Sequence, residues 1–393
     1  MKGEGEPGSV PMIRPPRLHL GREGTASRLE LFFDLAYVLV IMQLAIAFVD
    51  DLNWLGLAKL TGLFVAVWFS WVGFTLYANR FDTDDLIFRL AKLLATGAIA
   101  GCAASGADAV GSTAVPFAVC YLASRLIVFG LYVRAWRHLP DARPTIDVYL
   151  TVIGLSSLVW AISIATTGNT RYLLWGVAVA IDAVGPALAT LRRDKLPLHV
   201  EHLPERFALL VILVLGEAVG GGVRGVHEAH WAGPAVAVAA PGFAVAGALW
   251  WIYFDIGARG SADELQAAEE DSSPEKEAVD ERHDLFVYGH LPMTFGVVLA
   301  GVGIEELVLH PGEPLPSAYG WLLATGLGLF LGGVAMILGG TQRSWRAVWP
   351  WPLAAVPLVL AIALVPTSAV LLAGGYAVLL IALAIGGTRR SRR

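Results

Sequence analysis

The sequence predicts an all-α protein, a polytopic transmembrane helix bundle of about 12 spans. Of its 393 residues, 56% are hydrophobic and only 16% are charged, a composition that argues against a water-soluble enzyme. Apolar runs of about 20 residues, the length that crosses a bilayer as a helix, recur along the whole chain. Lysine and arginine also gather in alternate connections between these runs, as they do in membrane proteins.

Charged residues and clusters of proline and glycine divide the chain into successive apolar runs. Each run long enough to span the hydrocarbon core is taken as one helix. The expected helices are 30–49, 55–78, 88–107, 114–133, 147–167, 171–190, 205–223, 233–256, 286–304, 317–339, 347–364 and 368–386.

The distribution of basic residues predicts the orientation of these helices. With the N-terminus inside, 24 lysines and arginines fall on the inner side and three, Lys59, Arg171 and Arg224, on the outer side. Because cytoplasmic connections carry the excess of positive charge, both termini are expected in the cytoplasm and the protein in the plasma (inner) membrane. Residues 1–28 lack the apolar core of a cleaved signal peptide, so the first span is expected to direct insertion.

An internal repeat is expected. A Trp-rich helix, then Phe-Asp, then Asp-Leu at the start of the next helix occurs within 68–94, and again across 249–255 and 284–293. The copies lie six helices apart, which predicts two parallel six-helix repeats related by an axis along the membrane normal.

The repeat divides the chain into halves with short polar connections. Residues 258–284, which we call the acidic insert, carry ten acids and three bases and have the composition of a solvated linker. The expected units are a cytoplasmic tail 1–28, a first half 29–191, a connector 192–204, a second half 205–388 with the insert 258–284, and a basic tail 389–393.

Three ionisable residues lie deep within predicted spans, where a charge costs roughly 2.5–3.5 kcal/mol unless it finds a partner. Arg125 is expected to pair with Asp182 or Glu217, the acids nearest to it in depth. Asp182 precedes Gly185-Pro186, where proline is expected to break the helix and free carbonyl groups for a cation. Asp182 and Glu217 are therefore candidates for an ion-coupling centre.

A second set of candidates lies nearer the inner side. Glu30 and Asp34 are four residues apart and share one helix face, and His290 lies at a similar depth. These three are expected to form a cytoplasmic entrance. Structural or interface roles are expected for Arg28, Arg206, Asp255 and Glu305.

Close helix contacts are predicted where glycines are spaced four apart. Such GxxxG spacings occur at Gly97–Gly101, Gly216–Gly220, which flanks Glu217, and Gly328–Gly332. Glycine at this spacing lets two helix backbones approach each other.

No catalytic motif, metal site or cofactor is expected. Cys102 and Cys120 lie in apolar runs without ligand spacing, and the pair His227 and His230 has no further ligand nearby in the sequence. The formal charge of −5 implies no nucleic-acid partner. The expected partners are the lipid bilayer and a proton, a monovalent cation or a small solute, and the oligomeric state is left open.

Four blocks of the sequence point to a known family. They are RLELFFDLAYVLVIMQLA (28–45), PERFALLVILVLGEAV (204–219), WWIYFD (250–255) and YGHLPMTFGVVLAGVGIE (288–305). Through these blocks the chain resembles the bacterial low temperature requirement A (LtrA) family. The resemblance implies a multi-pass membrane protein named for a cold-growth phenotype, with no defined activity. Ala218 stands where the family's Leu-Gly-Glu block often continues with serine.

Three functions are open at this stage. Intramembrane acids and paired halves favour a secondary transporter or channel for protons, cations or a small solute. A membrane scaffold or sensor in cold or stress adaptation is one alternative, and an intramembrane lipid-modifying enzyme is another. Buried Arg–acid pairs that only lock helices together are the structural alternative for each site residue.

Overall fold

The computed structural model describes residues 12–18, 27–82, 84–191, 202–258, 276–315, 317–341 and 352–391. Within these residues, every one of the twelve predicted ranges contains a helix. The helices are α1 (Arg28–Val49), α2 (Trp54–Arg80), α3 (Leu86–Ala104), α4 (Ala114–His138), α5 (Arg143–Ile164), α6 (Gly168–Leu191), α7 (His202–Glu228), α8 (Gly233–Ile252), α10 (Lys276–Leu309), α11 (Ala318–Thr341), α13 (Pro352–Ile362) and α14 (Ala369–Ser391).

Shorter elements join or extend these helices. Strand β1 (Arg17–Leu18) pairs antiparallel with β2 (Phe81–Asp82), directly after α2. Two short 3₁₀ helices, η1 (Gly106–Asp108) and η2 (Pro140–Ala142), precede α4 and α5. A π-helical turn, η3 (Tyr253–Ala258), continues α8.

The architecture confirms an all-α, polytopic membrane bundle. In the described part of the chain, ten helices are long and apolar enough to cross a bilayer. Helices α6 and α13 are not among the ten. The 11 residues of α13 rise only about 16 Å, about half the thickness of the hydrocarbon core.

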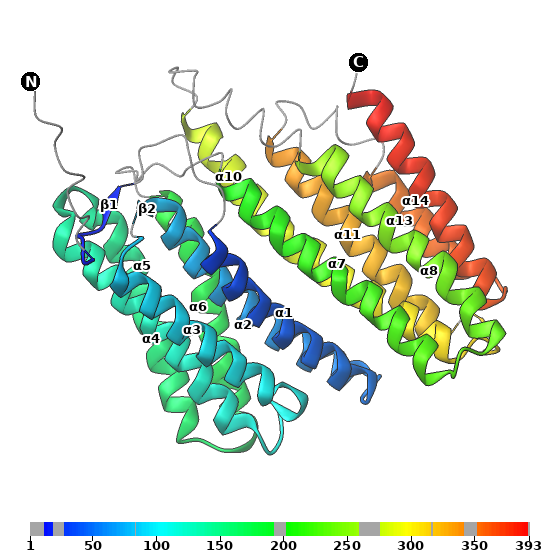
Figure 1. Ribbon diagram of the computed structural model, residues 1–393, viewed down its shortest axis with the longest axis horizontal. Helices are drawn as coiled ribbons and strands as arrows, with labels where there is room; N and C mark the ends of the chain where they lie inside the picture. The colour runs from blue at the N-terminus through cyan, green and yellow to red at the C-terminus, as the bar shows by residue number, and fades with distance from the viewer. Residues whose placement is uncertain are drawn as a thin grey trace, which may run out of the picture.

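Two groups of helices lie side by side (Figure 1). Helices α1–α6 form the first group, and α7, α8, α10, α11, α13 and α14 form the second. Helices α1 and α2 of the first group contact α7 and α10 of the second. Helix α1 begins, and α14 ends, on the same side of the bundle, which we call the terminal face.

The helices of each group contact one another in the same order. In the first group α1, α3, α4, α5 and α6 follow one another as neighbours, and α2 contacts both α1 and α6. In the second group the corresponding series is α7, α10, α11, α13 and α14, and α8 contacts both α7 and α14.

The closest helix contact is that of α10 with α11, and it is built from glycine. Gly289, Gly296 and Gly303 recur every seven residues on α10 and face Gly333, Gly326 and Leu323 of α11 in turn. A Cβ atom added at Gly296 would lie 2.4 Å from the carbonyl oxygen of Gly326. Only glycine therefore permits this separation of the two backbones.

The predicted GxxxG contacts are mostly wrong. Gly97, Gly216 and Gly332 have no atom within 4 Å of an added Cβ, and Gly328 has only an ordinary contact. Gly101 does meet a neighbour, since its Cβ would lie 2.5 Å from the sulfur of Cys120. Spacing alone identifies a smooth stripe on a helix, but the fold decides which stripe faces a partner.

Two further expectations are corrected by the backbone. Helix α6 continues unbroken to Leu191, so Gly185-Pro186 does not open the helix after Asp182. Residues 259–275 of the acidic insert lie outside the described residues, and from Lys276 onwards the insert forms the first turns of α10.

Candidate functional site

The candidate site is a buried charge cluster where the two helix groups meet near the terminal face. It consists of Glu30 and Asp34 on α1, Lys92 on α3 and Arg206 on α7, and we call these four residues the junction cluster. Asp34, Lys92 and Arg206 have no exposed surface, and Glu30 is 5% exposed. Two acids and two bases thus occupy one water-excluded region.

An ion pair across the two helix groups holds the cluster together. Nη2 of Arg206 donates to Oδ1 of Asp34 at 2.7 Å. The indole Nε1 of Trp71 on α2 donates to the same oxygen at 2.9 Å. Nε of Arg206 lies 3.9 Å from Oε1 of Glu30. One arginine of α7 is therefore placed against both acids of α1.

Glu30 has a second role in the local structure of α1. Its Oε2 accepts a hydrogen bond from the backbone N–H of Ser27, and the Ser27 hydroxyl accepts from the backbone N–H of Glu30. This reciprocal pair is a capping box, the Ser-x-x-Glu pattern that begins a helix. The position of Glu30 at the junction is thus fixed by the start of α1.

Several polar atoms of the junction cluster have no hydrogen-bond partner among the described residues. They are Oδ2 of Asp34, Nζ of Lys92, and Nε and Nη1 of Arg206. A buried ion pair retained only for packing usually satisfies all its polar atoms, because each unsatisfied one costs free energy. These atoms could bind a ligand, although buried polar atoms without a partner among the described residues also occur outside the cluster, as at Nε of Arg125.

His290, the third residue expected at the cytoplasmic entrance, is surrounded by aromatic side chains. Its Nδ1 bonds to the carbonyl of Phe286 at 2.7 Å, and its Nε2 bonds to the hydroxyl of Tyr253 at 3.1 Å. The ring of Phe207, the residue after Arg206, packs at a tilt against His290 and edge-on against Trp71, with ring centres 4.4 Å and 5.0 Å apart. His290 thus borders the junction cluster without contacting its charges.

Arg125 has the partner that the sequence predicts. Its guanidinium forms an ion pair with Oδ1 of Asp182 within the first helix group. Oδ2 of Asp182 accepts from the hydroxyl of Ser156 on α5 at 2.8 Å. The pair links α4, α5 and α6.

Glu217 belongs to a separate cluster in the second helix group. Nη2 of Arg224, two turns later on α7, lies 2.7 Å from Glu217 and 2.8 Å from Glu305 of α10. Close approach of α7 to α10 occurs at Gly221 and Gly225, where an added Cβ would lie 3.0 Å from the nearest α10 atoms.

The structure does not join the two acids expected to form one ion-coupling centre. Asp182 and Glu217 pair with different arginines in different helix groups, and no hydrogen bond or ion pair in the described chain links them. The Arg28 side chain is exposed at the start of α1. Asp255 accepts from the indole of Trp251 at 2.9 Å in the π-helical turn.

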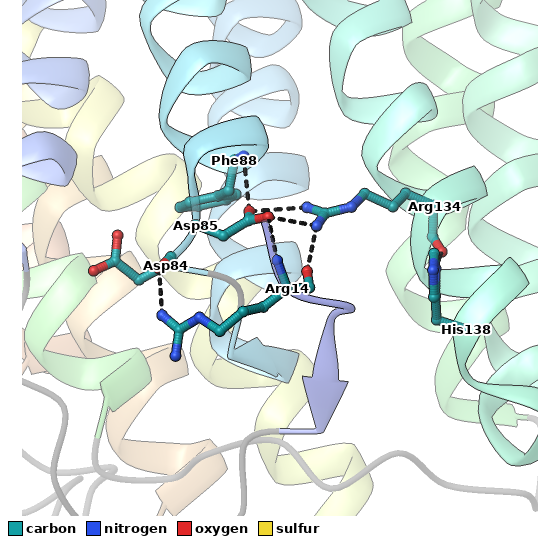
Figure 2. A network of polar contacts seen from close by, with 6 residues as sticks. All are labelled: Arg14, Asp84, Asp85, Phe88, Arg134 and His138. Atoms are coloured by element: carbon teal, nitrogen blue, oxygen red, sulfur yellow. Dashed lines mark hydrogen bonds and ion pairs between the residues drawn. The ribbon is translucent and has the colours of Figure 1, made fainter. Parts of the chain in front are cut away.

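A polar network ties the segment before α1 to the first group at the terminal face (Figure 2). Asp85, which caps α3, accepts two hydrogen bonds from the guanidinium of Arg134 on α4, at 3.0 and 2.6 Å. It also accepts from the backbone N–H of Phe88 and of Arg14. Arg134 in turn donates to the backbone carbonyl of Arg14.

The electrostatics of this network keep it intact at neutral pH. Burial raises the pKa of Asp85, but the hydrogen bonds from Arg134, Phe88 and Arg14 lower it by more, so its pKa lies below the usual value. The stabilisation is therefore complete above about pH 4, the pKa of an unfolded aspartate, and is lost as the pH falls through the lower folded-state pKa. The network holds the start of α3, the helix that carries Lys92.

Three residues of these clusters were missed as site residues from the sequence. From the sequence, Lys92 and Arg224 are only basic residues expected near the two sides of the membrane. Trp71 is only part of a Trp-rich helix. A signal existed for Arg224, because its spacing of seven residues from Glu217 places both on one helix face. Lys92 shares a helix face with Phe88, Ala95 and Ile99, all buried.

A cavity lies outside the junction cluster. An apolar cavity of about 600 Å³ lies between α7 and α8 and is lined by Ala218, Gly222, Trp231, Phe243 and neighbouring residues. Within the residues described, no group of three or more His, Cys, Asp or Glu is arranged to hold a metal ion.

Comparisons with known proteins identify the family. The model of the bacterial low temperature requirement A protein (LtrA) matches residues 25–385. An uncharacterized protein of Rhizobium meliloti (strain 1021) is 31% identical over 338 residues, which cover 81% of this chain and 76% of the relative. No solved structure matches the chain. The chain is a multi-pass helical bundle, and the family match covers nearly its whole length. It therefore belongs to the bacterial low temperature requirement A (LtrA) family.

Proposed function

We propose that the protein is a secondary transporter or channel for protons, monovalent cations or a small solute, with its pathway at the junction of the two helix groups. The observation that carries this proposal is the junction cluster. Its Asp34–Arg206 ion pair joins α1 to α7, and its buried polar atoms include several without partners. Ionisable groups buried at membrane depth line ion pathways and proton relays in membrane proteins.

The order of helix contacts supports the proposal. The equivalent neighbour series of the two groups are what two parallel six-helix repeats would produce. Transporters built from repeats place substrate and coupling-ion sites at the interface between the repeats, near the middle of the bilayer. The junction cluster lies where the two helix groups meet, about 9 Å from the start of α1 by helix rise and so nearer the terminal face than the middle of that helix.

The proposal places the ion-coupling role on Asp34 rather than on Asp182 and Glu217. Both oxygens of Asp182 hydrogen-bond, one to Arg125 and one to Ser156. Glu217 and Glu305 share Arg224 at the contact of α7 with α10. These arrangements favour the locking of neighbouring helices, whereas Oδ2 of Asp34 remains available.

Flux into liposomes tests the proposal. Purified protein should carry protons or a monovalent cation into vesicles under an imposed gradient. The variant Asp34→Asn keeps the size of the side chain but removes its charge, and it should reduce the flux to the level of empty vesicles. The matched control Asp84→Asn, at an exposed carboxylate on the terminal face, should transport like the wild type.

Two outcomes would contradict the proposal. One is the absence of proton, cation and small-solute flux for wild-type protein that is folded by its circular dichroism. The other is wild-type flux in a folded Asp34→Asn variant. Either result would favour a scaffold or sensor role.

A further inference from the structure

Lys92 is a lysine buried among aromatic side chains. Its side chain has no exposed surface, and its Nζ has no hydrogen-bond partner in the described part of the chain. The ammonium nitrogen lies 3.8 Å from the centre of the Phe33 ring, 5.3 Å from that of Phe74 and 6.0 Å from that of Phe88. Three aromatic rings therefore form a cage for a cation.

The cage compensates only part of the cost of burying the charge. An ammonium group is strongly hydrated, and without hydrogen-bond acceptors its removal from water is expensive. The charged groups within electrostatic range are Glu30 and Asp34 on α1 and Arg206 on α7, while α2 presents Phe74. The two carboxylates stabilise the ammonium, and the guanidinium of Arg206 repels it.

With Glu30 and Asp34 both ionised, the charges of the junction cluster balance when Lys92 is protonated. Lys92 and Arg206 then contribute two positive charges against the two negative charges of Glu30 and Asp34. Arginine does not lose its proton in proteins, whereas a buried lysine does so readily. Loss of the proton from Lys92 leaves the cluster with one excess negative charge, and Oδ2 of Asp34 has no hydrogen-bond partner among the residues that the structure describes.

We propose that Lys92 is the proton-carrying group of the junction cluster, and that a monovalent cation replaces its charge when the proton leaves. This inference rests on the proposed function and deepens it to an exchange of one proton for one cation. The N–H bond breaks, its electron pair stays on Nζ, and the proton passes to water on the terminal face. The cation then neutralises the cluster, with Oδ2 of Asp34 as a ligand.

Two substitutions of Lys92 have opposite expected effects. In wild-type vesicles, the rate of rubidium or sodium uptake should fall about tenfold per pH unit on the acidic side, since one proton must leave for each cation. Lys92→Met has no proton to lose, so uptake should persist at acidic pH. Lys92→Arg is permanently charged, so uptake should be lost at every pH. The control Lys59→Met, at a half-exposed lysine paired with Asp51, should keep the wild-type profile.

A second measurement does not depend on flux. In nanodiscs with ¹⁵N-labelled lysine, the Nζ signal of Lys92 is assigned by its absence in Lys92→Met. This signal should change from the ammonium to the amine form over the same pH range in which ion uptake rises, and should shift when rubidium or sodium is added above that range. Oδ2 of Asp34 is required for the second shift, so Asp34→Asn should abolish it.

The outcomes separate the two proposals. An ammonium signal that persists at the pH where uptake is fastest overturns the role of Lys92, and so does a pH profile that Lys92→Met leaves unchanged. If wild-type protein carries no ion but Lys92 loses its proton and the cluster binds a cation, the exchange site stands and the transport function fails.

Discussion

At the scale of single residues, the buried charged side chains form ion pairs whose surroundings differ. The Asp182 carboxylate is satisfied by Arg125 and Ser156, whereas Asp34 keeps one oxygen without a partner. Both acids are buried, so depth alone does not distinguish a structural pair from a site. The distinction lies in the carboxylates alone, since Nε of Arg125 also has no hydrogen-bond partner among the described residues.

The Arg125–Asp182 pair is therefore expected to govern stability. Arg125→Met should destabilise the fold by about 3–5 kcal/mol, because it leaves the Asp182 carboxylate buried without its counter-charge. The double variant Arg125→Met/Asp182→Leu should recover much of this loss. Thermal unfolding in detergent measures both, and equal melting temperatures for the wild type and the single variant would contradict the prediction.

At the scale of helices, glycine position determines which pairs approach most closely. On α10, glycines seven residues apart place one side of the helix directly against the α11 backbone. Glycines on other faces of α11, such as Gly332, meet no neighbour within 4 Å of an added Cβ. A glycine of these two helices thus allows a close backbone contact at one position and faces no neighbour at another.

Gly296→Ala is expected to destabilise the protein by about 1–3 kcal/mol, since its methyl group would overlap the α11 backbone, which yields less easily than a side chain. Gly332→Ala, the matched control, should be neutral or slightly stabilising, because alanine is the better helix former. Unfolding of the two variants in the same detergent compares them. A Gly296→Ala variant as stable as Gly332→Ala would show that the contact is looser than the structure has it.

At the scale of the whole molecule, the ends of the helical chain lie on one face of the bundle. This agrees with an even number of passages of the chain from one side of the bundle to the other. The excess of basic residues on the same side predicts that this face is cytoplasmic.

Reporter fusions test the orientation. An alkaline phosphatase fused after residue 393 or inserted in the acidic insert should be inactive, because both sites are expected inside. Fusions at the connection between α1 and α2 should be active, since that connection lies on the opposite face. An active enzyme at the C-terminus would overturn the predicted orientation.

Local sequence determined the helices. A segment that crosses hydrocarbon must form all its backbone hydrogen bonds within itself and carry an apolar surface, and a run of about 20 apolar residues shows both. The partnership of Arg125 with a buried acid was also predictable, since an isolated guanidinium at that depth is too costly. The tertiary structure alone decided that Arg206 of α7 reaches Asp34 of α1, 172 positions earlier, and that Lys92 lies among three aromatic rings. Those contacts depend on which helix faces meet across the junction of the two groups, and helix periodicity defines the faces without specifying their partners.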